Sequence, residues 1–330
     1  MNFGNIKQWG LLSALLAVPF LLCAQESVQT QDIEYAELKR LATGSLLLDV
    51  TRRPDGSLVA VGERGHVILS DDGEDWRQAE VVPTRSTLTA VTSVGDRLWA
   101  AGHDTVIITS GDGGLTWTRQ YFDPERLQAV MDIHFTDESN GVAMGAYGLY
   151  LVTEDGGENW EDESVDYENE YHLNSLILFE DGRRMIAGEA GFSYRSFDDG
   201  MTWEPLDLPY QGSMWGAQKS ADDCILFFGL RGHILESCDF GDTWEELNAA
   251  TMTSLSAAAE HQGRTVIVGN SGVILIRNES GEFSVYTHSS GVDFASIVSL
   301  DDGDFLLVGE DGVHRFPENS GTADQEGTPP

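Results

Sequence analysis

The sequence predicts an all-β fold, a seven-bladed β-propeller, on two observations. One short pattern recurs along the chain with leading glycines 40 to 43 residues apart. Each unit also consists of short alternating apolar runs separated by Gly and Asp turns, which at this period is typical of a propeller blade. The seven leading glycines, one for each expected blade, are Gly62, Gly102, Gly145, Gly188, Gly229, Gly269 and Gly309.

Each unit is expected to form four strands, and the second unit shows why. Residues 87–92 alternate between apolar and polar side chains, as a half-buried strand does. A Gly-Asp turn follows, and residues 97–102 return as a second strand. Residues 106–109 form a third strand, and residues 117–120 begin an outer one.

Between the third and outer strands lies an Asp box, with the pattern Ser/Thr-x-Asp-x-Gly-x-x-Trp. Its Asp is suited to accept hydrogen bonds from turn N–H groups, its Gly to adopt a positive φ, and its Trp to bury surface between blades. We therefore interpret the box as structural, on the rim opposite the usual ligand face of a propeller. The expected box residues are Asp71, Gly73 and Trp76; Ser110, Asp112, Gly114 and Trp117; Thr153, Asp155, Gly157 and Trp160; Ser196, Asp198, Gly200 and Trp203; and Ser237, Asp239, Gly241 and Trp244.

The last unit ends at Phe316 without an outer strand. Residues 33–38 alternate before the first full unit, so we expect this N-terminal strand to complete the seventh blade and close the ring, which would remove a free sheet edge. The expected organisation is a signal peptide at 1–24, a linker at 25–32, the propeller at 33–316 and a disordered tail at 317–330.

Residues 11–22 form an apolar stretch too short to span a bilayer, and Ala24 fits signal-peptidase cleavage. Lipidation through Cys23 is disfavoured because the preceding Leu22 is not small. We therefore expect a periplasmic or secreted protein with no membrane span. The formal net charge of −36 argues against binding to nucleic acid or to anionic lipid headgroups.

Cys224 and Cys238 flank an expected hairpin, each about seven residues from its centre at Leu230-Arg231. Antiparallel pairing would place them opposite each other, where a disulfide fits. A slip of one residue would place them on opposite faces, so the sequence leaves the disulfide open.

No metal-binding, nucleophile or nucleotide-binding motif is present in the sequence, and we expect no catalytic residue, metal or cofactor. Because Asp boxes also occur in sialidases, a glycoside hydrolase or carbohydrate-binding propeller is the alternative. Its nearest features are Arg52-Arg53-Pro54, which belongs to the Asp-box side, and the pairs Tyr167-Glu168 and Glu170-Tyr171 in one connection.

The expected partner-binding rim consists of the turns between second and third strands and the connections between blades, because variable polar and aromatic loops on a rigid ring suit protein recognition. Trp215, outside the boxes, is expected to pack in the channel. The candidate rim residues are Glu63, Arg64, His103, Asp104, Tyr147, Glu189, Arg231, Asn270 and Asp311.

The motif in residues 143–160 and 228–244 resembles the photosystem II stability/assembly factor family of seven-bladed propellers, and the resemblance extends over residues 33–316. It implies a non-catalytic factor that holds a membrane-protein intermediate. We therefore expect an exported, monomeric scaffold or assembly factor whose partner is an integral membrane protein or envelope complex. A sensor that binds a small ligand in the channel is a third hypothesis.

Overall fold

The computed structural model describes Met1 and residues 33–220, 224–278 and 280–318. The expected linker, Cys23 and all but the first residue of the expected signal peptide lie outside these ranges, as does the tail from residue 319. Among the described residues, no helix has the length and apolar character needed to cross a membrane.

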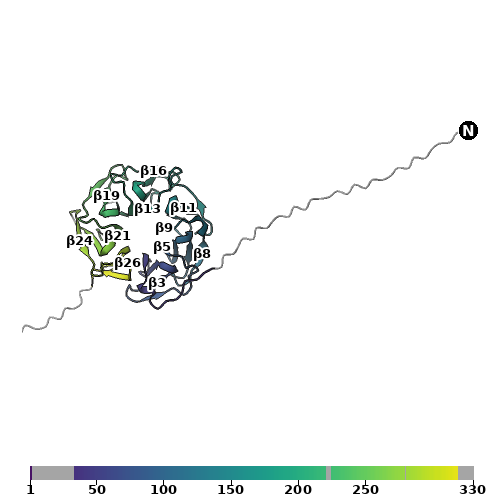
Figure 1. The fold of residues 1–330 in the computed structure, drawn as a ribbon, viewed down its shortest axis with the longest axis horizontal. Helices are drawn as coiled ribbons and strands as arrows, with labels where there is room; N and C mark the ends of the chain where they lie inside the picture. The colour runs from purple at the N-terminus through teal and green to yellow at the C-terminus, as the bar shows by residue number, and fades with distance from the viewer. Residues whose placement is uncertain (2–32, 221–223, 279, 319–330) are drawn as a thin grey trace, which may run out of the picture. The chain divides into compact units, whose positions relative to one another are not determined.

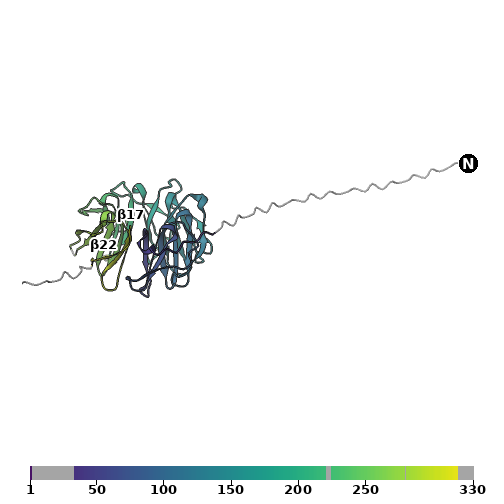
Figure 2. The same cartoon turned by 60° about the horizontal axis from the view of Figure 1, so that its bottom comes forward.

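From Ile33 onward, the described chain forms seven antiparallel sheets around a central opening (Figure 1). Six sheets have four strands and the seventh has three, and hydrogen-bonded neighbours are always consecutive in sequence. Turning the ring shows the blades standing side by side (Figure 2). The predicted seven-bladed, all-β propeller is confirmed.

The strands of the seven blades can be grouped by their position from the channel outward. The inner strands are β1 (Leu47–Arg52), β5 (Leu88–Val94), β9 (Val130–Phe135), β13 (Leu173–Leu178), β17 (Met214–Lys219), β21 (Leu255–His261) and β25 (Phe294–Ser299). The second strands are β2 (Leu58–Gly62), β6 (Arg97–Gly102), β10 (Gly141–Gly145), β14 (Arg184–Gly188), β18 (Ile225–Gly229), β22 (Arg264–Gly269) and β26 (Phe305–Gly309). The third strands are β3 (Val67–Ser70), β7 (Ile107–Ser110), β11 (Tyr150–Thr153), β15 (Tyr194–Ser196), β19 (Ile234–Ser237), β23 (Val273–Arg277) and β27 (Gly312–Phe316). The outer strands are β4 (Trp76–Gln78), β8 (Thr118–Tyr121), β12 (Glu161–Asp162), β16 (Glu204–Pro205), β20 (Glu245–Leu247) and β24 (Phe283–Thr287).

Short 3-10 turns complete the described elements. They are η1 (Ala42–Gly44), η2 (Glu63–Gly65), η3 (His103–Thr105), η4 (Pro124–Arg126), η5 (Ala146–Gly148), η6 (Glu189–Gly191), η7 (Leu230–Gly232) and η8 (Asn270–Gly272).

The core lies between neighbouring blades, so the second strands are buried on both faces and their sequences are apolar almost throughout. All five residues of β2, β10, β18 and β26 are buried. Between blades two and three, Trp99 stacks on Phe135 with ring centroids 3.7 Å apart. Such pairs add about 0.5–1.5 kcal/mol beyond the area they bury.

The leading glycines are required by a close approach of backbone. At Gly62, an added Cβ would overlap the carbonyl oxygen of Leu46, in the segment that enters the inner strand of the same blade. The same overlap with the corresponding carbonyl recurs at Gly102 and Gly145. Packing between the turn and the inner strand therefore sets the period seen in the sequence.

The Asp boxes act as hydrogen-bonded turns, as predicted. In blade two, the Gly114 N–H donates to Ser110 Oγ over 3.0 Å, and the Thr116 N–H donates to Asp112 Oδ1 over 2.9 Å. The indole N–H of Trp117 donates to the Gly114 carbonyl over 2.8 Å. These bonds satisfy turn groups that have no partner in the sheet.

The predicted register of the first box was wrong. Asp72, not Asp71, accepts the N–H groups of Glu74 and Asp75, and Ser70 takes the serine position. Asp71 instead forms an ion pair with Arg77. This box is one residue shorter between its Ser and its Trp than the others, so counting back from the Trp gave the wrong Asp.

The predicted closure of the ring by an N-terminal strand was also wrong. Residues 33–39 form no strand, and the Ala36 N–H donates to the Val82 carbonyl, which follows blade one, over 3.0 Å. Gln78 of β4 bonds Glu37 and Lys39. Among the described residues, blade seven therefore keeps three strands. Alternation predicted a strand-like segment but could not identify the edge it lies against.

The ordered propeller extends slightly beyond the expected boundary at Phe316. The Ser289 N–H donates to a Glu318 carboxylate oxygen over 2.8 Å. Of the expected tail, Pro317 and Glu318 are therefore part of the described structure, whereas the rest lies outside it.

Candidate binding site

Seven turns between second and third strands form one rim, which we call the turn rim: residues 63–65, 103–105, 146–148, 189–191, 230–232, 270–272 and 310–311. Most of these turns are bonded to the connection that leads into the next blade. The Gly148 N–H, for example, donates to the Tyr171 carbonyl, and the Gly191 N–H donates to the Gly212 carbonyl. The turns and the connections between blades therefore share one face, as the sequence analysis expected. All nine predicted rim residues lie in these turns.

The middle residue of every turn is left-handed, with φ between 54° and 61°. These residues are Arg64, Asp104, Tyr147, Ala190, Arg231, Ser271 and Asp311. The residue that follows also has a positive φ, as type I′ hairpin turns require. A side chain in this conformation costs roughly 1–2 kcal/mol, which glycine would avoid. The rim therefore displays charged and aromatic side chains at positions where backbone stability alone would favour glycine.

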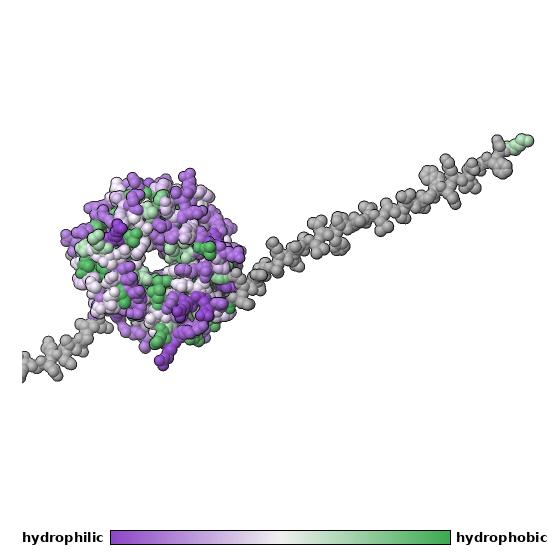
Figure 3. All heavy atoms as spheres, viewed as in Figure 1, coloured by the Kyte–Doolittle hydropathy of each residue, from purple (hydrophilic) through white to green (hydrophobic). Residues whose placement is uncertain are grey.

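A cavity of about 340 Å³ lies where the turn rim meets the channel mouth at blades three to five. It is lined by Met131, His172, Asn174, Glu189, Ser213 and Trp215. The space-filling view shows the central opening of the ring, with hydrophobic residues beside it on a mostly hydrophilic face (Figure 3). We call this cavity the mouth cavity.

Three lining residues reach the mouth cavity because of a β-bulge. Every inner strand has an irregular register near its start, and Met131, Asn174 and Trp215 are the residues skipped by the pairing in β9, β13 and β17. A bulge re-aims a side chain that a regular strand would direct differently. The same position in three successive blades therefore lines the cavity with two large apolar side chains, Met131 and Trp215, and with the amide of Asn174 between them.

Hydrogen bonds fix the polar lining but leave acceptors open. The Asn174 Nδ2–H donates to the Met214 carbonyl over 2.9 Å, and the His172 N–H donates to Glu189 Oε2 over 3.2 Å. The Ala190 N–H donates to Ser213 Oγ over 3.2 Å. In the described part of the chain, Asn174 Oδ1 and Glu189 Oε1 have no donor.

Aromatic rings adjoin the mouth cavity. Tyr147, which is 54% exposed at a left-handed turn position, contacts His172 edge to face at 4.8 Å. Trp215 is 36% exposed and belongs to none of the buried clusters, so the expected packing in the channel was wrong. Within the described residues, no ring or cation packs on its indole.

Side chains of the channel join the blades. Asp132 accepts the Leu176 N–H of blade four over 2.8 Å, and His134 Nε2 lies 3.0 Å from Asp132 Oδ1. Burial opposes protonation of His134, but the charge and hydrogen bond of Asp132 outweigh it, so the pKa of His134 is raised. Burial likewise raises the pKa of the Asp49 carboxyl to about 6, against the hydrogen bonds it accepts from Ser296 and Val91.

The features considered for a glycosidase do not meet at the mouth cavity. Arg52 and Arg53 border a separate cavity of about 600 Å³ on the Asp-box side, where they form ion pairs with Asp301 and Asp96. This is the side that the sequence predicted for them. Tyr167 is 88% exposed, and Tyr171 stacks on Phe192 with centroids 3.9 Å apart.

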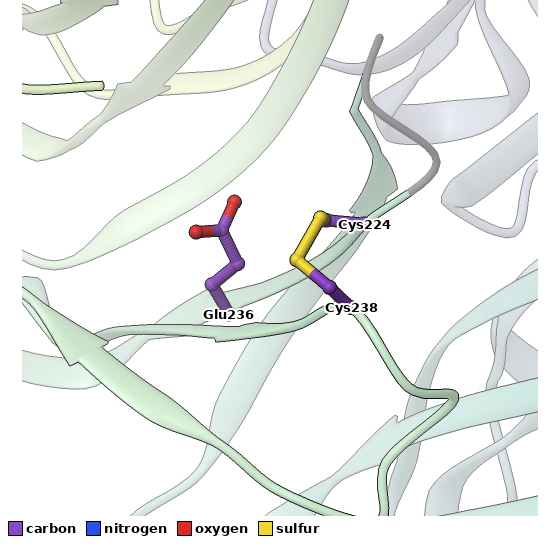
Figure 4. A group of neighbouring side chains, drawn as sticks. All are labelled: Cys224, Glu236 and Cys238. Atoms are coloured by element: carbon purple, nitrogen blue, oxygen red, sulfur yellow. A yellow bond between two sulfur atoms is a disulfide. The ribbon is translucent and has the colours of Figure 1, made fainter. Parts of the chain in front are cut away.

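Cys224 and Cys238 form a disulfide across the start of β18 and the end of β19, which settles the question that the sequence left open. Glu236 lies beside it (Figure 4). The three residues resemble a metal site by type, but disulfide sulfurs are not thiolate ligands. Glu236 also forms a two-fold ion pair with Arg277, over 2.6 and 3.1 Å. This donor set does not suit a metal ion.

The sequence predicted Glu189 and Tyr147 at the rim but missed Met131, His172, Asn174 and Ser213. One signal was present: Met131, Asn174 and Trp215 repeat at the blade period, each as the second residue of an inner strand. The period alone does not show that the three side chains meet at one end of the channel, because their meeting depends on the bulge in each strand.

A family model matches part of the chain. Residues 125–213 match the family model described as photosynthesis system II assembly factor YCF48. No curated protein sequence matches the chain. The matched residues span blades three and four and include five of the six residues that line the mouth cavity.

Solved structures share the fold at low identity. YCF48 bound to a D1 peptide is 18% identical, with a TM-score of 0.68 over 86% of this chain and 95% of that one. YCF48 from Cyanidioschyzon merolae is 17% identical, with a TM-score of 0.66 over 86% and 98%. Virginiamycin B lyase from Staphylococcus aureus is 11% identical, with a TM-score of 0.71 over 85% and 97%. The chain is therefore a seven-bladed propeller similar to the photosystem II assembly factor YCF48.

Proposed function

We propose that this chain is a non-catalytic, exported propeller that serves as a scaffold, assembly or stability factor for an envelope membrane-protein complex. It binds a segment of its protein partner at the turn rim around blades three to five. The observation that carries this proposal is the coincidence of the family match, residues 125–213, with the sector that lines the mouth cavity.

Three further observations support the proposal. A YCF48 structure contains a D1 peptide, so a propeller of this kind binds a protein segment. The Cys224–Cys238 disulfide suits an oxidising compartment such as the periplasm, because disulfides are rare in reducing cytosol. The formal charge of −36 would favour a partner with a basic face.

The test is an affinity capture by the tagged, full-length protein from gently solubilised envelopes, read by mass spectrometry. We expect recovery of an integral membrane protein that is lost with Tyr147→Ala, since Tyr147 is exposed at the rim beside the cavity. Phe197→Ala is the matched control, because this exposed ring lies in an Asp box on the opposite side. Recovery that both variants retain equally, or recovery of no membrane protein, would contradict the proposal.

A further inference from the structure

The mouth cavity has the chemical character of a cation site. Two of its polar atoms are open acceptors: Glu189 Oε1 and Asn174 Oδ1 have no donor among the described residues. The other carboxylate oxygen, Glu189 Oε2, accepts the His172 N–H and lies 3.9 Å from His172 Nδ1. No Lys or Arg lines the cavity. Because a carboxylate at a partly enclosed surface forms its strongest hydrogen bonds with ionised donors, a cationic group is the ligand that this lining best satisfies.

The indole of Trp215 adds a second attraction for a cation. It is exposed on the cavity wall, and within the described part of the chain no other ring or charged group covers it. Tryptophan gives the strongest cation–π interactions of the aromatic side chains, and planar guanidinium groups stack on it well. An arginine side chain would use its flat face on Trp215 and its N–H edge toward the acceptors.

The surroundings of the cavity also favour a basic group. The connection that leads into β13 carries Asp166, Glu168 and Glu170 and has no Lys or Arg between residues 163 and 172. Tyr171 of this connection is bonded through its carbonyl to the turn that presents Tyr147. Positive charge would therefore be attracted toward the mouth before it makes contact.

We propose that the mouth cavity binds a basic side chain, an arginine, from an extended segment of the protein partner. Trp215 stacks on the guanidinium, while Glu189 and Asn174 accept its N–H groups. Met131 contacts the aliphatic part of the side chain. This inference deepens the proposed function and rests on it for the source of the arginine, but the chemistry of the cavity can be tested without a partner.

The test titrates the full-length protein with N-acetyl-arginine methylamide and follows the indole N–H signal of Trp215 by NMR, assigned with Trp215→Phe. The corresponding citrulline compound is the matched probe, because it has nearly the same shape without the charge. We expect saturable shifts of the Trp215 signal with the arginine compound and at least tenfold weaker binding of the citrulline compound.

Variants then assign the contacts. Glu189→Gln keeps an acceptor for the His172 N–H but removes the charge, and it should weaken binding of the arginine compound about tenfold, as expected for loss of a charge-assisted hydrogen bond. Glu154→Gln is the control, since Glu154 is exposed in an Asp box on the other side. Equal binding of the two compounds, or unchanged binding by Glu189→Gln, would overturn the inference.

The outcomes separate this inference from the proposed function. Binding of the arginine compound at Trp215 without any captured membrane protein would leave the cavity chemistry standing and contradict the scaffold. Capture of a membrane protein that depends on Tyr147, without any response of Trp215 to the arginine compound, would leave the scaffold standing and overturn the arginine site.

Discussion

Ser296, in the inner strand of blade seven, donates a hydrogen bond to Asp49, in the inner strand of blade one, over 2.7 Å. The same carboxylate accepts the Val91 N–H of blade two over 2.8 Å. Asp49 thereby joins the last blade to the first two. This polar link lies at the junction where, among the described residues, blade seven lacks an outer strand.

Similar side-chain bonds join most neighbouring inner strands. Thr89 Oγ1 donates to the Val130 carbonyl, and Ser256 Oγ donates to the Phe294 carbonyl, each over 2.5 Å. These bonds sit at the bulge position of their strands. A bulge residue can therefore join two blades, as Thr89 and Ser256 do, or line the channel mouth, as Trp215 does. Asn174 does both.

We predict that Asp49 makes stability depend on pH between about 4 and 6. Its pKa is about 6 in the folded protein, above the ordinary 3.8. The protonated carboxyl therefore makes its full contribution to the free energy of unfolding below pH 3.8, and this contribution is lost as the pH rises through 6. The asparagine of Asp49→Asn cannot ionise. The unfolding free energy of this variant should therefore increase relative to that of wild type as the pH rises from 4 to 7.

Urea denaturation at each pH measures this difference. Loss of one hydrogen bond by the asparagine adds a constant offset of about 1–3 kcal/mol, which does not change with pH. Asp207→Asn is the control, because Asp207 is exposed and its side chain forms no hydrogen bond or ion pair with any described residue. The difference between this variant and wild type should stay flat. A flat difference for Asp49→Asn as well would refute the prediction.

We predict that Gly232→Ala is more destabilising than Gly263→Ala. Both glycines have a positive φ, +75° and +80°, so both alanines carry a conformational cost of about 1 kcal/mol. At Gly232, the added Cβ would also overlap the Thr251 carbonyl oxygen, whereas at Gly263 it meets no atom within 4 Å.

The difference between the two variants therefore isolates the packing of the turn rim against the next connection. Denaturation midpoints of wild type and both variants provide the measurement. We expect Gly232→Ala to lose at least about 1 kcal/mol more than Gly263→Ala, the usual cost of overpacking. Equal losses would mean that the turn moves freely away from Thr251.

The blades were predictable from the sequence because their determinants are local. The period comes from glycines such as Gly62, where backbone crosses backbone, and from boxes such as Ser110 to Trp117, whose bonds span only a few residues. The first box was misplaced because a single missing residue moves the Asp relative to the Trp. Local patterns therefore predict the element and its type better than its register.

The site and the ring closure were less predictable because they depend on contacts between distant residues. Met131, Asn174 and Trp215 come from different blades, and their meeting depends on bulges that no turn residue marks. Residues 33–39 alternate like a strand, but hydrogen bonds to Gln78 and Val82 place them beside blade one. The blade period of the three bulge residues does not show that they meet, and the contact of residues 33–39 with blade one leaves no period in the sequence.

We predict that the Cys224–Cys238 disulfide stabilises the protein by about 3 kcal/mol. The two cysteines are 14 residues apart, and the entropy lost by the unfolded chain on closing such a loop corresponds to roughly that amount. The double variant Cys224→Ser/Cys238→Ser should unfold at lower denaturant. A reductant should move the wild-type midpoint toward that of the variant and leave the variant unchanged.

Peptide mass mapping without reduction provides the direct check of the bond. A cross-linked peptide pair containing both residues is expected, and it should separate on reduction. Recovery of two free thiols from the purified protein would show that the disulfide does not form.

We predict that the box carboxylates stabilise the fold down to strongly acidic pH, with Asp239 as the clearest case. Hydrogen bonds from the Thr243 hydroxyl and N–H and from Ser237 lower the pKa of Asp239 to about 2. Because the pKa is lowered, the ionised carboxylate contributes to stability above pH 3.8, and this contribution is lost as the pH falls through 2. Asp239→Asn should therefore be less stable than wild type by a constant amount from pH 7 to pH 4, and the difference should narrow toward pH 2. Urea midpoints over this range measure the difference, with Asp207→Asn again as the control. A difference that persists undiminished at pH 2 would show that the shape of the side chain, and not its charge, holds the turn.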